Sequence, residues 1–215
     1  MSTKHFVRIG VACMLLAGCK PPQPTYLAQP EVIQAQGAYV HGPSGMTFPT
    51  TVGDFQRASI TRYDAAGQDM GAGYNLLAPG WAVAATVYVY PAPSLISIGS
   101  PSDVVASARA TLCKTEFERR KGELIGAHPG ARQIGEKDAP LPQGGPPLPG
   151  KMAAFEYDDL FAGARLPLHS ELYVFCYVGG KWAFEYRFTS PRNFAATEAI
   201  AAFMMKLPWT VPPGS

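Results

Sequence analysis

The sequence predicts an α+β domain built on a largely antiparallel β-sheet with two main helices packed on it. Three observations lead to this prediction. Runs of β-branched and aromatic residues recur along the chain, separated by turns that contain Gly or Pro. The pair Gly179-Gly180 separates two such runs and is typical of a tight hairpin. Two segments carry apolar residues at helical spacing, and the order of strands, helix, strands and helix favours an antiparallel sheet.

Length and charge limit the possible function classes. The chain has 215 residues, of which 47% are hydrophobic and 16% are charged, which is enough for one ordinary folded domain. Residues 1–18 hold two of the 18 basic side chains and none of the 16 acidic ones, so the remainder is formally neutral. A neutral chain without a Lys/Arg cluster argues against nucleic acid as a partner.

The N-terminus has the pattern of a secretion signal. Lys4 and Arg8 precede the apolar run Ile9–Leu15, which is far shorter than the roughly 20 residues that span a bilayer. The next four residues, Leu16-Ala17-Gly18-Cys19, resemble the lipobox of bacterial lipoproteins. This resemblance implies cleavage before Cys19 and acylation of that residue, for example with palmitate. An ordinary signal peptide and a buried structural N-terminus are the alternatives.

The same resemblance implies a location. In enterobacterial lipoproteins an Asp after the acylated Cys retains the protein at the inner membrane, whereas this chain has Lys20 at that position. We therefore expect a lipid anchor in the outer membrane, with the protein facing the periplasm. The expected partners are the membrane, through the lipid, and an envelope protein.

Gly and Pro, with 22 and 21 residues, are more frequent than in an average chain and mark its divisions. We expect a signal peptide at 1–18, a lipidated Cys and Pro/Gln-rich tether at 19–47, and a single α+β domain at 48–212. A tether of this composition is extended and solvated. Packing of part of it on the domain is the alternative, because Tyr26, Val32, Ile33, Tyr39 and Val40 are more apolar than a pure spacer needs. The stretch 140–150 is rich in Pro and Gly and predicts a long exposed loop.

The first strands are expected on both sides of a glycine-rich turn. Phe55–Tyr63 predicts one strand, and the segment from Asp64 to Gly73 predicts the turn that leads into residues 74–77. Trp81–Tyr90 alternates small and β-branched residues with further apolar and aromatic ones. Because both faces of this strand are apolar, it is expected at the centre of the sheet.

A helix is expected to begin at Pro101, with Ser100 as its N-cap, and to end at Gly122. The helical spacing places four residues on its apolar face: Ala106, Ala110, Cys113 and Phe117. Two strands are expected after it, at Arg132–Lys137 and Met152–Asp158.

The hairpin at Leu172–Val178 and Lys181–Thr189 is the clearest element. A two-residue loop predicts four cross-strand pairs: Val178 with Lys181, Tyr177 with Trp182, Phe175 with Phe184, and Tyr173 with Tyr186. One face then carries an aromatic ladder, and the opposite face carries Cys176, Glu185 and Arg187.

A second helix is expected after Pro191 and before Pro208, with Ala196, Ile200, Phe203 and Leu207 on one face. The element order, the Trp182–Arg187 stretch and the final Leu-Pro-Trp are similar to the PsbP-like fold, which also occurs in small bacterial lipoproteins. The resemblance implies that fold for about residues 48–209 and brings no catalytic motif.

Two cysteines remain after Cys13 leaves with the signal and Cys19 takes the lipid. Cys113 and Cys176 are expected to pair in an oxidising compartment, where a bond closing 63 residues contributes about 4 kcal/mol in the chain-entropy model. Two separate buried thiols are the alternative.

The usual catalytic motifs are absent from the sequence, and we predict no enzyme, no cofactor and no metal site. The three histidines that follow the expected signal peptide, His41, His128 and His169, are expected on the solvated surface. Glu156 and Asp158 share a strand face and could serve calcium binding or acid–base chemistry, but a solvated strand end is the favoured interpretation.

The aromatic ladder is the remaining candidate surface. Tyr173, Trp182, Tyr186 and Arg187 are the residues that we expect to bind a ligand or partner, unless the second helix covers the ladder. The leading hypothesis is a non-enzymatic, lipid-anchored periplasmic interaction module. The alternative is a periplasmic protein that binds a small ligand or a metal in a pocket near Tyr173, Tyr186 and Arg187.

Overall fold

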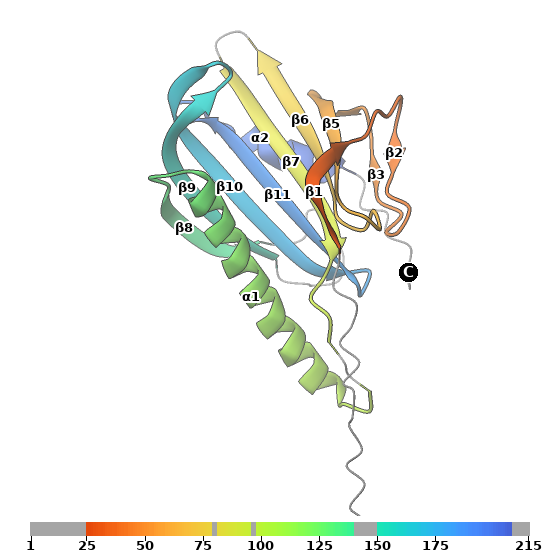
Figure 1. The fold of residues 1–215 in the computed structure, drawn as a ribbon. Helices are drawn as coiled ribbons and strands as arrows, with labels where there is room; N and C mark the ends of the chain where they lie inside the picture. Colours follow the sequence, from red (N-terminus) through yellow and green to blue (C-terminus); the bar gives the residue numbers. More distant parts are fainter. Residues whose placement is uncertain (1–24, 79–80, 96–97, 140–149, 208–215) are drawn as a thin grey trace, which may run out of the picture.

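A computed structural model describes residues 25–78, 81–95, 98–139 and 150–207. One sheet of nine antiparallel strands dominates the fold, with one helix on each of its faces (Figure 1). The α+β class with a largely antiparallel sheet is therefore confirmed. The elements, in chain order, are β1 Tyr26–Val32, β2 Tyr39–Val40, β3 Thr47–Phe48, β4 Thr51–Val52, β5 Phe55–Asp64, β6 Met70–Ala78, β7 Trp81–Pro91, α1 Ser102–Ala127, β8 Arg132–Ala139, β9 Gly150–Phe161, β10 Ala164–Val178, β11 Trp182–Pro191 and α2 Thr197–Lys206.

The strands follow the order β1-β5-β6-β7-β11-β10-β9-β8, with β4 also paired to β5. β7 lies between β6 and β11, as its two apolar faces predict. The glycine-rich turn is shorter than predicted, because β6 begins at Met70 and includes Gly71 and Gly73. These glycines pair with Thr61 and Ser59 of β5, so they belong to the sheet and leave one of its faces nearly bare.

The hairpin β10–β11 departs from the predicted register at its turn. The pairs Phe175–Phe184 and Tyr173–Tyr186 are as predicted, but Val178 lies opposite Trp182 instead of Lys181. Tyr177 has a φ of 59°, in the left-handed region, and the register shifts between Phe175 and Val178. This bulge turns Tyr177 away from the aromatic ladder and places it in the cluster on the α1 side.

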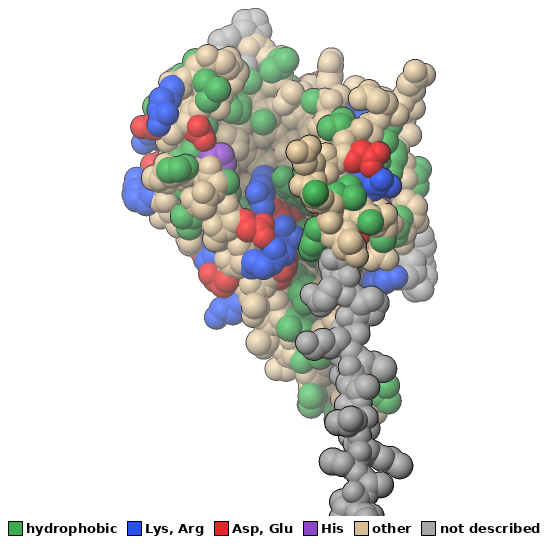
Figure 2. Space-filling view, viewed as in Figure 1, with side chains coloured by type: hydrophobic (Ala, Val, Ile, Leu, Met, Phe, Trp, Pro, Cys, Tyr) green, Lys and Arg blue, Asp and Glu red, His purple; other side chains and the backbone are tan. Residues whose placement is uncertain are grey.

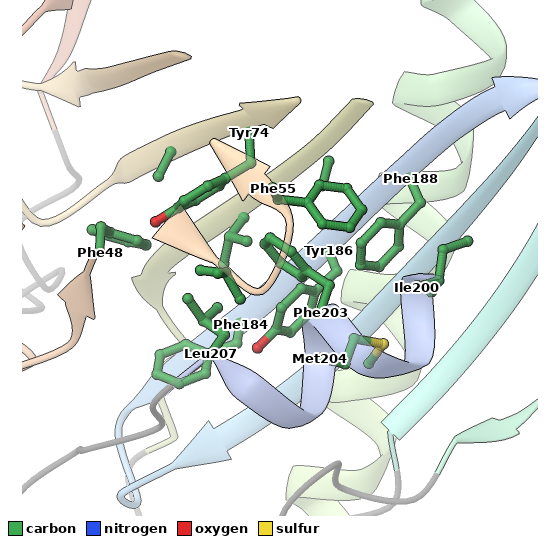
Figure 3. Close-up of a cluster of buried hydrophobic side chains, with 14 of the residues drawn as sticks. Phe48, Phe55, Tyr74, Phe184, Tyr186, Phe188, Ile200, Phe203, Met204 and Leu207 are labelled. Carbon is green, nitrogen blue, oxygen red and sulfur yellow. The ribbon is translucent and has the colours of Figure 1, made fainter. Parts of the chain in front are cut away.

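The aromatic ladder is sealed against α2. Phe203 stacks edge-to-face on Phe188 and on Tyr74, with ring centroids 5.5 and 5.3 Å apart. Figure 3 shows Ile200, Phe203 and Met204 of α2 packed over the rings of β11. The four residues predicted for the apolar face of this helix, Ala196, Ile200, Phe203 and Leu207, are all buried. The aromatic ladder is therefore part of the hydrophobic core, as expected if the second helix covers it.

The predicted tether is wrong from residue 25 onward. β1 pairs with β5 at the edge of the sheet, and β2 pairs with β3. His41, expected on the surface, is fully buried: its Nε2 donates to the carbonyl of Gly67 at 2.8 Å, and Ser44 Oγ donates to its Nδ1 at 2.6 Å. The His41 ring also meets Trp182 edge-on at 5.3 Å. The segment is held by these polar contacts and by a few apolar ones, since Met46 is fully buried and Ile33 and Tyr39 pack against the core.

The first helix differs from its prediction at both ends. It begins at Ser102, after Pro101 as N-cap, and it passes Gly122 to end at Ala127. Only its C-terminal half packs on the sheet, through Phe117, Lys121 and Leu124, while Ala106 and Ala110 are exposed. The N-terminal half extends past the end of the sheet (Figure 1).

A disulfide joins Cys113 of α1 to Cys176 of β10, with Cα atoms 5.8 Å apart. It attaches the helix to the sheet where the packed half of α1 begins. Several predictions lie outside the described residues: the signal peptide, the lipobox with Cys19, Lys20, and most of the loop at 140–150.

Candidate functional site

The four residues predicted to bind a ligand or partner lie on both faces of the sheet. Trp182 and Tyr186 are fully buried in the core beneath α2, so neither offers a surface. Tyr173 is half-buried on the same face and lines a cavity of about 360 Å³ beside α2. Arg187 lies on the other face, in a different cavity. The structure therefore does not form the predicted pocket that joins Tyr173, Tyr186 and Arg187.

The cavity that contains Arg187 is a groove on the α1 face of the sheet, with a volume of about 470 Å³. We call it the α1 groove. Figure 2 shows charged side chains gathered at the middle of this face, beside a hollow. Its lining residues come from β1, β5, α1 and the neighbouring strands: Tyr26, Leu27, Pro30, Tyr63, Asp69, Tyr88, Arg119, Arg120, Glu123 and Arg187.

The floor of the groove is aromatic and lies close to the backbone because the strand beneath it carries Gly71. Gly71 pairs with Thr61 on one side and with Tyr88 on the other. A Cβ at Gly71 would lie 3.1 Å from Tyr88 Cδ1 and 3.2 Å from Tyr63 Cε2, so the two rings use the space that a side chain would fill. The rings are tilted by 42° with centroids 5.9 Å apart. The glycine thus lets an aromatic floor lie close to the backbone.

One wall of the groove is a buried network of ion pairs between α1 and β11. Glu185 is fully buried, and its carboxylate binds Arg187 Nε and, at 3.1 Å, Arg120 Nε. Tyr90 adds a neutral partner, since its hydroxyl accepts from Arg120 Nε at 3.1 Å. A buried carboxylate requires such compensation, because removing a charge from water costs several kcal/mol.

The helix supplies the rest of this network. Glu116 accepts from Arg119 Nη2 at 2.6 Å and from Arg120 Nε at 2.8 Å, and Glu123 binds both arginines. Burial raises the pKa of Glu116, but its hydrogen bonds to Arg119 and the charge of Arg120 lower it further, so the net pKa is depressed. The guanidinium of Arg120 also lies over the ring of Tyr90, 4.0 Å from the centroid. The arginines are thus held in place before any ligand arrives.

Burial strongly shapes the titration of the aromatic residues. It raises the pKa of Tyr63, and the neighbouring Tyr88 raises it further, so this hydroxyl stays protonated. Burial likewise raises the pKa of Tyr90, where Glu185 adds to the effect. These phenols therefore act as neutral hydrogen-bonding groups in the groove.

Asp69 lies directly before β6 and belongs to the groove lining. Burial raises its pKa to about 6; the charge of Arg120 opposes this shift, and Asp64 and Glu185 add to it. Its backbone N–H donates to Asp64 Oδ1 at 3.1 Å, whereas its own carboxylate has no hydrogen-bond or ion-pair partner within the described part of the chain. Asp69 is therefore a partly desolvated carboxylate that faces an open groove.

The other candidates from the sequence are engaged in local ion pairs. Glu156 binds Arg132 at 3.1 Å and Arg192 at 3.4 Å, and Asp158 lies 3.7 Å from Arg192. His128 stacks on Tyr157 and lies 2.7 Å from Asp159. Among the described residues, no group of three or more His, Cys, Asp or Glu side chains is arranged to hold a metal ion.

His169 interacts with Glu171, a residue that lines the cavity of about 360 Å³ beside α2. The hydroxyl of Tyr173 donates to Glu171 Oε2 at 2.5 Å, and Glu171 Oε1 lies 3.3 Å from His169 Nε2. Burial raises the pKa of Tyr173, and the bond to Glu171 adds to the rise. This cavity is lined mainly by apolar groups such as Met152, Ile200 and Met204.

Sequence reasoning missed most of the groove. Its charged wall does leave a signal, since Glu116, Arg119, Arg120 and Glu123 follow the spacing of one helical face. Such a stripe does not by itself predict a groove, because charged residues on a helix usually face solvent. The contribution of Asp69 could not be predicted, because it depends on the edge strand β1 coming back to form the opposite wall.

In the part of the chain that the structure describes, no helix is both long and apolar enough to cross a membrane. Comparison of the chain with family models, characterised proteins and solved structures finds no match.

Proposed function

We propose that this chain is a lipid-anchored, non-enzymatic protein of the bacterial envelope that acts through contacts with other envelope components. The observation that carries the proposal is the succession of a basic start, a short apolar run and the sequence Leu16-Ala17-Gly18-Cys19. In this proposal Cys19 carries the lipid, and the anchor lies in the outer membrane with the domain in the periplasm. The disulfide between Cys113 and Cys176 supports an oxidising compartment.

The position of β1 sharpens the proposal. Only residues 20–25 separate Cys19 from Tyr26, a length of about 25 Å at most when fully extended. Tyr26 pairs with Asp64, at the end of the sheet from which α1 extends. The proposed anchor thus holds this end of the domain close to the bilayer, where Ile98 is 95% exposed and Val104 53% exposed. The domain rests near the membrane instead of being suspended on a long tether.

The finer fold assignment is also a proposal. An antiparallel sheet, a Trp- and Tyr-rich hairpin late in the chain and a C-terminal helix support a PsbP-like fold. A non-enzymatic role is supported by the ion pairs that engage Glu156 and Asp158, the acidic residues best suited to catalysis by sequence.

Metabolic labelling with a palmitate analogue tests the proposal directly. Wild-type protein is expected to incorporate the label and to sediment with outer-membrane vesicles, and Cys19→Ser is expected to lose both properties. Cys13→Ser is the matched control, because Cys13 lies in the segment that we expect to be removed. Equal labelling of wild type and Cys19→Ser would contradict the anchor, and turnover of a substrate that is abolished by Glu156→Ala would contradict the non-enzymatic role.

Binding of a small ligand is the second candidate function, and the α1 groove favours it. Its floor and walls combine aromatic rings, positioned arginines and an unpartnered carboxylate in about 470 Å³, a volume typical of small-molecule sites. A ligand that binds the native state raises the midpoint of thermal unfolding. Such a shift is expected for the wild-type protein and for Cys19→Ser alike, because the groove does not involve the anchor.

A further inference from the structure

We infer that the α1 groove binds a short peptide in its zwitterionic form, with the ammonium group at Asp69 and the terminal carboxylate at Arg187. This inference rests on the second candidate function and names its ligand class. Three features of the groove lead to it: the carboxylate of Asp69, which has no partner among the described residues; a guanidinium nitrogen of Arg187 that likewise has none; and an aromatic floor between them.

The carboxylate end requires a positive charge. The wall network pairs three arginines with three glutamates, Glu116, Glu123 and Glu185, so its formal charges balance. Asp69 adds one negative charge that no ion pair within the described residues neutralises. The rings of Tyr26 and Tyr63 lie in the same lining. An ammonium group placed here gains an ion pair and the faces of aromatic rings, a combination that recognises organic cations.

The guanidinium end offers free donors. Arg120 uses Nε and Nη1 toward Glu116, Glu185 and Glu123, and Arg187 uses Nε and Nη2 toward Glu185 and Glu123. The remaining nitrogens, Nη2 of Arg120 and Nη1 of Arg187, have no partner within the described part of the chain, and neither is a buried unsatisfied atom. Arg120 lies over the ring of Tyr90 and close enough to Asp69 to lower its pKa, so it belongs to the Asp69 end of the groove. Nη1 of Arg187 is the free donor away from Asp69, and a guanidinium N–H suits a carboxylate.

The register sets the length of the ligand. Arg187 pairs with Thr86, which pairs with Gly73, so Arg187 lies level with a residue four positions from Asp69 along β6. The Arg187 guanidinium lies over Tyr88, which pairs with Gly71, so its offset from Asp69 along the strand is about two residues, or roughly 7 Å. β6 and β11 are two strands apart, which adds roughly 10 Å across the sheet. An extended tripeptide covers about 10 Å between its ends. Tyr63 and Tyr88 lie beneath this path, above Gly71.

Trialanine and its two blocked forms test the inference with probes of nearly equal size. Calorimetric titration of the purified full-length chain is expected to show saturable binding of trialanine. N-acetyl-trialanine lacks the ammonium group and trialanine amide lacks the carboxylate, and each is expected to bind at least tenfold more weakly. Equal binding of trialanine and N-acetyl-trialanine would overturn the assignment of the ammonium site while leaving a ligand-binding groove in place. Absence of trialanine binding would overturn the inference altogether.

Two matched pairs of variants place the binding in the groove. Asp69→Asn is expected to weaken trialanine binding at least tenfold, and Asp54→Asn, at an exposed turn, to leave it unchanged. Gly71→Ala is expected to weaken binding because its methyl group displaces the rings of Tyr63 and Tyr88, whereas Gly126→Ala meets no atom within 4 Å and is expected to be neutral. Asp69→Asn is not expected to impair folding, so an unchanged affinity in that variant would contradict the inference.

Discussion

The two faces of the sheet carry different kinds of side chain along β7 and β11. On the α2 face, Phe184, Tyr186 and Phe188 pack against Phe203 in a closed aromatic core (Figure 3). On the α1 face, Tyr88 of β7 and Glu185 and Arg187 of β11 point toward α1. Ion pairs link β11 to the helix here, and a groove remains beside them. Because side chains alternate along a strand, β7 and β11 both supply residues to the two faces. The comparison shows that the α2 face is closed by aromatic packing, whereas the α1 face combines the apolar cluster around Phe117 and Leu124 with a charged groove.

Truncation on the α2 face has the largest expected effect. Phe203→Ala removes a fully buried ring that contacts Phe55, Tyr74 and Phe188, and a loss of about 3–5 kcal/mol in the free energy of unfolding is expected. Urea denaturation measures this change. Met205→Ala, in the same helix but 66% exposed, is expected to cost less than about 0.5 kcal/mol. Similar losses in the two variants would mean that α2 does not seal the core as described.

Reduction of the disulfide tests how α1 is attached. The bond closes a loop with a sequence separation of 63, and its loss is expected to cost about 3 kcal/mol, slightly below the chain-entropy limit of about 4 kcal/mol. Thermal unfolding with and without dithiothreitol measures the effect in the wild-type protein. The double variant Cys113→Ala/Cys176→Ala serves as the control and is expected to be insensitive to the reductant. Mass spectrometry that finds two free thiols in the unreduced protein would contradict the bond.

Removal of the buried charge on the α1 face comes next. Glu185→Gln leaves Arg120 and Arg187 without their shared carboxylate, and a loss of about 2–3 kcal/mol in stability is expected. Glu118→Gln is a suitable control, because Glu118 is half exposed and pairs only with Lys121 among the described residues. Equal stability of Glu185→Gln and the wild-type protein in denaturant titrations would show that the network is not held together by this carboxylate.

His41 provides a pH-dependent test of the N-terminal segment. Burial lowers its pKa below the ordinary 6.5, partly opposed by the hydrogen bond to Gly67, so the folded state requires the neutral ring. Its contribution is therefore complete above pH 6.5 and is lost as the pH falls through the folded-state pKa. His41→Ala is expected to cost about 2 kcal/mol at pH 7.5 and less at pH 5. A cost that is the same at both pH values would contradict the buried, neutral histidine.

The smallest expected effect has the opposite pH dependence. Asp69 has a folded pKa of about 6, above its ordinary 3.8, so the wild-type protein loses stability as the pH rises between these values. Asp69→Asn is expected to be about 1 kcal/mol more stable than the wild type at pH 7, after allowance for solvent contact, and equal to it at pH 3.5. Unfolding midpoints at the two pH values measure this. Burial is the main cause of the raised pKa of Asp69, and the charges of Arg120, Asp64, Glu185 and Arg119 modify it.

The regular elements could be predicted because each depends on neighbouring residues alone. The alternation in β7 and the helical spacing of Ala196, Ile200, Phe203 and Leu207 correspond to the burial that the structure shows. The predicted cross-strand pairs of the hairpin are wrong only next to the turn. There the positive φ of Tyr177 shifts the pairing by one residue, so that Val178 lies opposite Trp182. That bulge depends on backbone strain that no pattern of apolar residues records.

The errors share a different cause. The tether prediction took a low apolar content as evidence of solvation, whereas His41 and Ser44 hold their segment in the core through hydrogen bonds. The groove escaped prediction because its walls, α1 and β1, are distant in the chain and meet only through the topology of the sheet. The aromatic ladder attracted attention as a surface, but its size and apolar character suit it better to a core.

Tyrosine ring signals test the contrast between the two faces most directly. The chain labelled with ¹³C at the tyrosine ε positions carries Tyr63 and Tyr88 in the α1 groove and Tyr74 and Tyr186 beneath α2. Titration with trialanine is predicted to shift the Tyr63 and Tyr88 resonances with a common saturation curve and to leave those of Tyr74 and Tyr186 in place. Shifts confined to Tyr74 and Tyr186, or no shift at any of the four, would contradict a sealed α2 face and an open, ligand-binding α1 face.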